Sequence, residues 1–334
     1  MRSPYALHVV ERWDARLDAA LAQLPETPSC SHELYRALAG SLPTRERLLA
    51  LVERDGEAVA LLALRRQQRH WRLVTDGVVP SPAAPCVPGE LLPALRALRR
   101  DIWVGAQDAP PPRGVPVSAT YAIQAYRMPA TADFEAFWHE TGMWGMVKRG
   151  RESTKRFDIR VDEGPGAAEW TLRQWAHRWQ SDETRALPQL LVAADYLQRR
   201  GLYHTFRMFD GERPIAGYNF QAVGGQLVFQ TTWFDERYAT RKVGARLFEY
   251  AFFWARDNGF DEIDIGGGHD YKALWAPPRG ELWAYNLCPW PRGALKRARA
   301  LAASLVRRSR PAEHNAGPPR APRAAAAVNQ PPAG

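Results

Sequence analysis

Apolar and polar residues follow the same order in two distant parts of the chain, residues 48–74 and residues 203–233. In each part an apolar run leads into an Asp-Gly pair, a second apolar run follows, and a short polar break precedes a third. Asp-Gly between such runs predicts a hairpin, so each part predicts a three-stranded antiparallel meander. Asp-Gly hairpins are common, and two can be alike by accident. A glutamate directly follows both Asp55-Gly56 and Asp210-Gly211, however, and favours an internal duplication.

Apolar residues with helical spacing precede each meander. Residues 31–39 predict one helix ahead of the first meander, and residues 171–179 and 187–199 predict two ahead of the second. Between the two units, the proline-rich residues 109–116 predict a stiff extended linker, and residues 118–127 predict a strand. Both halves therefore mix strands with helices, which is typical of an α/β (α+β) fold with a mixed sheet.

The length of the chain, 334 residues, exceeds the usual size of one domain. We predict an N-terminal domain over residues 1–125 and a C-terminal domain over residues 126–291. Residues 292–310 are rich in arginine and predict a basic helix, which could dock on the body or lie on an anionic membrane surface. Residues 311–334 are mostly Pro, Ala and Gly and predict a disordered tail.

Charge and cysteine content narrow the class of protein. The net charge of +9 favours an anionic partner, which could be a nucleotide-bearing cofactor, nucleic acid or a lipid surface. Charges interrupt the apolar residues of positions 1–16, which argues against a signal peptide, and no run has transmembrane length. The cysteines, Cys30, Cys86 and Cys288, are odd in number and too widely spaced for a zinc site. We expect a cytoplasmic protein, with peripheral contact to the inner membrane through the basic helix, and no metal.

The first segment that carries chemistry lies between a strand that ends near Trp233 and a helix that ends at Asn258-Gly259. A basic, glycine-bearing loop followed by a helix predicts an anion site, because free backbone N–H groups and the positive helix end converge on phosphate oxygens. The alternative is a solvated surface loop with an ordinary helix cap. The candidate cofactor-binding residues are Thr240, Arg241, Lys242, Val243, Gly244 and Ala245.

A second segment favours the anion site over that alternative. A short strand over residues 259–265 runs into three glycines, Gly266–Gly268, and then into Tyr271-Lys272. Consecutive glycines weaken a strand, so a close approach of the backbone to a ligand or to another strand is the better reason for them.

Residues 144–275 resemble the acetyltransferase domain of the CelD type, named for cellulose-biosynthesis proteins and similar to the FemABX peptidyltransferases of the GNAT superfamily. The resemblance rests on four segments: 148–156, the second meander, 238–244 and 264–275. It implies a tandem-GNAT chain that binds acetyl-CoA or another acyl-CoA at residues 240–245. Arg241 and Gly244 match the Arg-x-x-Gly of the GNAT loop, whereas Arg246 stands where the family has a small residue. The N-terminal half has no such loop and is expected not to bind cofactor.

Acyl transfer to an amine needs a group that accepts a proton, donors for the oxyanion and an acid for the thiolate. Tyr271 lies roughly where GNAT enzymes carry a tyrosine acid, although a packed aromatic is the alternative. Asp264 and His269 are the base candidates; His269 needs no shift of its pKa to act near neutrality, and Asp264 would need burial. Lys272 could stabilise developing negative charge or form an ion pair.

A basic stretch on a predicted helix gives the candidate substrate-binding residues Lys148, Arg149 and Arg151, whose charge suits an anionic acceptor such as a phosphate-linked sugar. The expected function is N- or O-acyl transfer to a small-molecule or glycan-precursor acceptor of sugar, amino-sugar or amino-acid type. Two alternatives stay open. One is a peptidyltransferase that uses aminoacyl-tRNA, with the basic helix binding RNA, and the other is a non-catalytic binding module.

Overall fold

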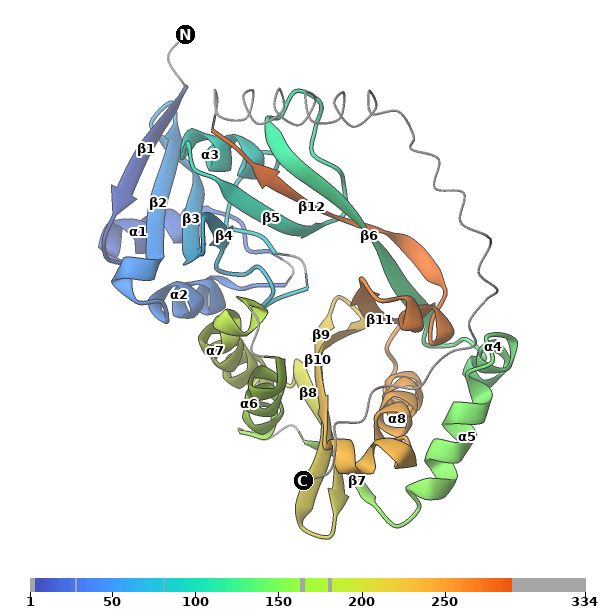
Figure 1. Ribbon diagram of the computed structural model, residues 1–334. Helices are drawn as coiled ribbons and strands as arrows, with labels where there is room; N and C mark the ends of the chain where they lie inside the picture. The colour runs from blue at the N-terminus through green and yellow to red at the C-terminus, as the bar shows by residue number, and fades with distance from the viewer. Residues whose placement is uncertain (1–3, 28, 81, 163–165, 180–181, 290–334) are drawn as a thin grey trace, which may run out of the picture. The chain divides into compact units, whose positions relative to one another are not determined.

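The computed structural model describes residues 4–27, 29–80, 82–162, 166–179 and 182–289. Within this part the strands form one twelve-stranded mixed sheet (Figure 1). The strands are β1 (Tyr5–Val10), β2 (Arg47–Arg54), β3 (Glu57–Gln67), β4 (His70–Leu73), β5 (Ile102–Gln107), β6 (Val117–Pro129), β7 (Asp158–Asp162), β8 (Tyr203–Asp210), β9 (Arg213–Val223), β10 (Gln226–Phe234), β11 (Glu262–Gly267) and β12 (Pro278–Leu287).

Helices connect these strands. The α-helices are α1 (Ala15–Gln23), α2 (His32–Gly40), α3 (Leu91–Ala97), α4 (Phe134–Glu140), α5 (Trp144–Ser153), α6 (Ala167–Trp179), α7 (Leu187–Gln198) and α8 (Val243–Asp257). The 3₁₀-helices are η1 (Thr44–Glu46), η2 (Asp182–Ala186), η3 (Glu236–Arg241) and η4 (Asp270–Leu274). The predicted helices at 31–39, 171–179 and 187–199 are confirmed as α2, α6 and α7. At α2 the Ser31 side chain caps the helix by accepting from the Leu34 amide.

Both predicted meanders are confirmed. Strands β2, β3 and β4 pair in antiparallel order, as do β8, β9 and β10. In each half a helix then leads to a strand that pairs parallel to the third strand of the meander: α3 leads to β5 beside β4, and α8 leads to β11 beside β10. The sheet is therefore mixed, as predicted.

The duplication extends beyond the meanders. Each half follows the same order of one strand, two helices, three meander strands, one helix and one strand, with β1 to β5 in the first half and β7 to β11 in the second. The first strand of each half pairs antiparallel with the first meander strand. The order of strands in the sheet, β1-β2-β3-β4-β5-β12-β6-β11-β10-β9-β8-β7, places the two copies in opposite directions about the β12-β6 pair.

The two central strands join the halves. β6 is the strand predicted at 118–127, and it follows residues 108–116, which form neither helix nor strand. β12 comes from the C-terminal half of the chain and pairs antiparallel with β5 on one side and with β6 on the other. The predicted boundary between residues 125 and 126 consequently lies inside a strand, and the described residues between 4 and 289 belong to one compact unit.

Two hydrophobic cores lie on this sheet, and they do not divide at the predicted boundary. The first contains β2, β3, α1 and α2 together with buried residues of α6 and α7, such as Leu172 and Leu190. The second contains α4, α5, α8 and one face of β8 to β11. Along β9 neighbouring residues face opposite helices: Gly217 lies against Thr171 of α6, and Tyr218 packs on Phe248 of α8.

The predicted basic helix at 292–310 and the predicted disordered tail at 311–334 lie outside the described residues. In the described part, every helix is too short or too polar to cross a bilayer. The three cysteines are free.

Candidate active site

The parallel pairing of β10 with β11 is short, and a cavity lies beyond its end. The pairing joins Gln226–Val228 to Glu262–Asp264 and stops there, whereas β10 continues to Phe234 with a register shift between Phe229 and Thr231. Side chains from the later part of β10 and from the segment after β11 line this cavity. The end of the strand pairing thus leaves room between the two strands for a ligand.

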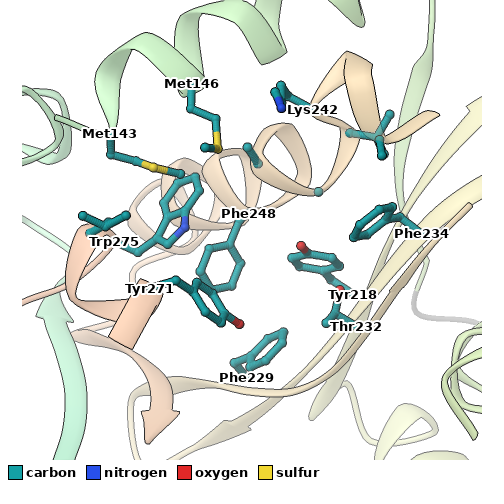
Figure 2. Close-up of a pocket in the computed structure, with 15 residues that line it drawn as sticks. Met143, Met146, Tyr218, Phe229, Thr232, Phe234, Lys242, Phe248, Tyr271 and Trp275 are labelled. Atoms are coloured by element: carbon teal, nitrogen blue, oxygen red, sulfur yellow. The ribbon is translucent and has the colours of Figure 1, made fainter. Parts of the chain in front are cut away.

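This space, which we call the α8 cavity, has a volume of about 250 Å³ (Figure 2). Its polar side chains are few: Tyr218, Thr232, Lys242 and Tyr271. The remaining lining comes from α5, β10, α8 and the η4 region and is mostly apolar: Met143, Met146, Phe229, Phe234, Ala239, Val243, Gly244, Ala245, Phe248, Leu274 and Trp275. A largely apolar concave site with a few polar groups is typical of small-molecule binding.

The N-terminus of α8 opens on this cavity. Lys242, the residue before the helix, has the left-handed conformation (φ 58°, ψ 34°), and no side chain caps the helix. A right-handed residue followed by a left-handed one turns successive N–H groups toward one point and forms an anion-binding nest. Within the described residues we find no acceptor for the N–H groups of Val243, Gly244 and Ala245. The geometry is therefore suited to a phosphate group.

The position of the helix start differs from the prediction. The loop was expected to include Gly244, but α8 begins at Val243, so Val243, Gly244 and Ala245 form its first turn. Thr240 and Arg241 belong to η3 instead. Thr240 is exposed, and the Arg241 guanidinium lies 5.8 Å from the centre of the Phe157 ring, while the Arg241 carbonyl accepts from Ser153 of α5. Helix α5 thereby fixes the backbone that leads into the nest.

Gly244 is needed for steric reasons. Its backbone is helical, but a Cβ atom at this position would lie 2.9 Å from the Tyr218 Oη atom and 3.5 Å from Phe234. Tyr218 is buried among Phe229 and Phe248 and has little freedom to move. Because glycine has no side chain, the wall of the α8 cavity stays open beside the nest.

Tyr271 lies on η4 at the opposite wall (Figure 2). Its side chain is 50% exposed, and partial burial raises the pKa of its hydroxyl. A tyrosine with a raised pKa keeps its proton at neutral pH and can donate it to an anion that forms in the cavity. Burial raises the pKa of Tyr218 further, so two neutral phenols border the same space.

His269 stacks on Tyr271, with ring centroids 5.9 Å apart and an angle of 27° between the planes. It is exposed and lies outside the α8 cavity, lining a second cavity on the β6 side with Gly268 and Asp270. The two predicted proton-transfer residues thus lie next to each other but border different cavities.

Asp264 is engaged in structural contacts. Its Oδ2 atom accepts from Arg127 Nε of β6 at 2.7 Å, and its Oδ1 atom accepts from the Gly266 amide at 2.6 Å. Both oxygens are occupied, which reassigns Asp264 from base candidate to a residue that holds β11 on β6. Gly267 fits the same contact, because a Cβ atom at this position would lie 2.7 Å from the Gln124 carbonyl oxygen of β6. The close approach is thus to another strand.

Lys272 lies beneath this glycine segment and does not line the α8 cavity. Its side chain is buried, its Nζ atom donates to the Gly267 carbonyl at 3.0 Å, and it lies 5.6 Å from the centre of the Phe229 ring. Burial lowers the pKa of Lys272 to about 8, although the Asp264 charge acts in the opposite direction. We reassign Lys272 from stabilising negative charge to positioning the loop that carries His269 and Tyr271.

The buried lysine should make stability depend on pH. Its pKa in the folded protein lies below the ordinary value of 10.5, so between about pH 8 and 10 the unfolded chain binds more protons and stability rises with pH. We expect the unfolding free energy of the wild type to increase by about 2 kcal/mol over this window relative to Lys272→Met. Urea denaturation at several pH values measures the difference.

The comparison with Lys272→Met removes effects that both proteins share. Burial raises the pKa of Cys30 to about 12, for example, and this thiol lowers stability in the same window in both. The exposed Lys148 provides a control, since Lys148→Met should follow the wild-type curve. Parallel curves for wild type and Lys272→Met would contradict a lowered pKa of Lys272.

The three basic substrate-binding candidates lie on α5 and differ in their contacts. Arg151 forms ion pairs with Glu135 and with the buried Glu249 of α8, and Glu249 also pairs with Arg246 at 2.9 Å. Arg151 therefore links α4, α5 and α8 through its ion pairs. The guanidinium of Arg246 lies along α8 beside the Glu249 carboxylate. Lys148 and Arg149 are exposed and form no ion pair with the described residues. None of the three lines the α8 cavity.

Sequence reasoning missed Tyr218, Met143, Met146 and Phe248. For Tyr218 the sequence contains a signal. Side chains alternate along β9, so Tyr218 and Gly217 lie on opposite faces of the strand, and the face of Tyr218 packs on α8, the helix after β10. The two methionines line the cavity from the start of α5 and the residue before it, which the sequence does not place beside α8.

The corresponding helix in the N-terminal half, α3, has Glu90 at its N-cap. The Glu90 carboxylate accepts from Tyr5 Oη at 2.7 Å and pairs with Arg54, and it forms no capping hydrogen bond to the helix. The expectation that the first copy does not bind cofactor stays a prediction.

The sequence and the fold are similar to those of acetyltransferases and related proteins. Residues 143–273 match the sequence profile of the acetyltransferase (GNAT) domain, which is less than half of the chain. No curated protein matches the sequence. The fold is similar to the crystal structure of FemX (TM-score 0.50, 11% identity, 86% of this chain and 99% of that chain). It is also similar to the C-terminal domain of a putative lysylphosphatidylglycerol synthetase from Agrobacterium fabrum (TM-score 0.50, 11% identity, 87% and 96%).

A tandem GNAT protein from the clavulanic acid biosynthesis pathway has a TM-score of 0.48 at 11% identity, over 86% of this chain and 99% of that chain. At 11% identity the two structures with a TM-score of 0.50 show the fold alone. The chain has a mixed α/β fold of two GNAT-like halves, and the profile match supports general acyl-transfer chemistry in the second half.

Proposed function

We propose that this protein transfers an acyl group from acyl-CoA to an amine or hydroxyl acceptor, as an enzyme of the CelD-type branch of the GNAT superfamily. The observation that carries the proposal is the uncapped N-terminus of α8 beside the α8 cavity. The nest at Lys242 and the first-turn amides suit a pyrophosphate, and the apolar cavity suits the uncharged arm and acyl group of the donor.

The residues of the cavity can assist the chemistry at defined points. The acceptor nitrogen or oxygen forms a bond to the carbonyl carbon of the thioester, the carbon–sulfur bond breaks, and one proton passes from the acceptor to the departing thiolate. Tyr271 is suited to give the thiolate its proton, because its hydroxyl stays protonated at neutral pH. His269, stacked on Tyr271 from the other side, is suited to take the proton of the acceptor.

Binding of the donor can be tested directly. We expect acetyl-CoA to stabilise the protein against thermal unfolding, by about 2.7 kcal/mol at a concentration one hundred times the dissociation constant. Thermal-shift and calorimetric titrations with CoA, acetyl-CoA and total tRNA measure this. The tRNA arm separates acyl-CoA from an aminoacyl-tRNA donor. Folded protein that responds to no CoA species would overturn the proposal.

A further inference from the structure

A second cavity borders the same loop on its other side. It has a volume of about 480 Å³ and is lined by Gly268, His269 and Asp270 of the loop, by Trp103 of β5, by residues of β6 and by Ala284 of β12. We call it the β6 cavity. His269 lines the β6 cavity and Tyr271 lines the α8 cavity, so the segment that carries both residues borders the two spaces.

Aromatic rings form much of the wall of the β6 cavity. Trp103 and Tyr121 lie with ring centroids 5.7 Å apart at an angle of 41°, and Tyr126 lines the same space. Tyr121 is 52% exposed, although a large aromatic side chain is usually covered in a folded protein. Arg72 lies over the Trp103 ring at 5.2 Å and pairs with Asp76, so its charge is already compensated. The Tyr121 ring is therefore the aromatic surface available to a ligand.

Polar groups stand beside these rings. The Gln124 amide nitrogen donates to the carbonyls of Ala125 and Gly280, which fixes the side chain and leaves its carbonyl oxygen as an acceptor. Asp270 is exposed and forms no ion pair with any described residue. Flat apolar rings next to fixed planar acceptors suit a ring-shaped polyol, whose axial C–H groups pack on an aromatic face while its hydroxyl groups donate to the acceptors.

The charge of the lining selects among such ligands. It contains one carboxylate, Asp270, and one histidine, and it contains neither lysine nor arginine. A phosphate group would meet the carboxylate without a compensating cation, whereas a protonated amine would be attracted to it. A protonated amine must also lose a proton before it can attack a thioester, and His269 stands in the same wall.

We infer that the β6 cavity is the acceptor site and that the acceptor is a sugar ring with a free primary amine. The inference rests on the proposed acyl transfer and gives its substrate class. It replaces the expectation of an anionic acceptor held by the basic residues of α5. The acyl group of the donor in the α8 cavity and the amine in the β6 cavity would then meet beside His269 and Tyr271.

The experiment uses the full chain with acetyl-CoA and three sugar probes: glucosamine, glucose and N-acetylglucosamine. We expect saturable binding of glucosamine by calorimetry or saturation-transfer NMR, and formation of N-acetylglucosamine by mass spectrometry. Glucose lacks the amine and N-acetylglucosamine carries it already acylated, so both should bind at least about tenfold more weakly.

Two substitutions locate the site. Tyr121→Ala, at an exposed ring, should weaken glucosamine binding at least about fivefold without loss of folding. Asp270→Asn should remove the preference for glucosamine over glucose. Trp179→Ala is the matched control, because Trp179 is an exposed aromatic residue outside both cavities, and it should bind like the wild type.

A measurement of acetyl-CoA binding separates a failure of the proposed acyl transfer from a failure of the acceptor site in the β6 cavity. If acetyl-CoA binds and glucosamine does not, or if Tyr121→Ala and Asp270→Asn leave glucosamine binding unchanged, the assignment of the β6 cavity is overturned while the acyltransferase proposal stands. If acetyl-CoA itself does not bind, the proposed function fails first.

Discussion

Replacing Tyr271 by phenylalanine is expected to lower the turnover number by about a hundredfold to ten-thousandfold, the usual range for loss of a general acid. The substitution removes only the hydroxyl that faces the α8 cavity, and the ring that stacks on His269 remains. The dissociation constant for acetyl-CoA should stay within about twofold of the wild type, because the nest at the start of α8 is untouched. Steady-state kinetics with the acceptor and calorimetry with acetyl-CoA measure the two quantities separately.

A matched tyrosine is available as a control. Tyr250 lies on α8, is partly buried beside the second core and lines neither cavity. Tyr250→Phe should therefore keep its turnover. If Tyr271→Phe turned over at the wild-type rate with normal affinity for acetyl-CoA, Tyr271 would be a packing residue, and the proton would have to come from Tyr218 or from water.

Gly244→Val is expected to raise the dissociation constant for acetyl-CoA, by about 5-fold to 150-fold if overpacking of about 1–3 kcal/mol falls on the bound state. The new Cβ atom would lie 2.9 Å from Tyr218 Oη, and the branched side chain would fill the cavity wall beside the first-turn amides. Gly244→Ala should show a smaller effect of the same sign. Calorimetric titration gives the affinity, and circular dichroism checks that each variant is folded.

Gly145 offers a matched control on a neighbouring helix. It lies in α5 with helical backbone, and a Cβ atom there would meet no atom within 4 Å. Gly145→Ala and Gly145→Val should therefore bind acetyl-CoA as the wild type does. Unchanged affinity in folded Gly244→Val would show that the donor phosphates do not approach the start of α8.

Much of the fold could be predicted because its signals are local. An Asp-Gly pair between apolar runs specifies a hairpin within a few residues, and both meanders follow from such pairs. The same holds for the start of α8, since the basic residues, the glycine and the helix are adjacent in the sequence. The prediction placed the helix start too late, because the left-handed conformation that ends η3 occurs at Lys242, which is not a glycine. It also assigned Thr240 and Arg241 to a loop, whereas they belong to η3.

The parts that could not be predicted depend on contacts between distant residues. Arg151 appeared to belong to a solvated or substrate-binding face, because Glu249, its buried partner, is 98 residues away. Asp264 appeared free to act as a base, because Arg127, which is 137 residues away, meets it only when β11 pairs with β6. Single-sequence patterns report on periodicity and turns, and they contain no information on which surfaces meet.

The division of the fold into two cores also depends on contacts that the sequence does not reveal. The sequence predicted a boundary between residues 125 and 126, but α6 and α7, which follow that boundary, contribute to the first core with α1 and α2. Direct contacts confirm this, since Tyr196 of α7 hydrogen-bonds with Ser31 at 2.7 Å and Arg200 pairs with Glu33 at 2.7 Å. A repeat in sequence therefore does not have to be an independent domain.

The position of β12 determines when this sheet can be completed during synthesis. β5 and β6 leave the ribosome early, yet the strand that pairs with both of them is made of residues 278–287. Until those residues emerge, the nascent chain carries two unpaired strand edges in the middle of its future sheet, and such edges invite pairing with other chains. A polypeptide that stops before β12 would keep both edges unpaired. The central part of the sheet can therefore be completed only after the second copy has been synthesised.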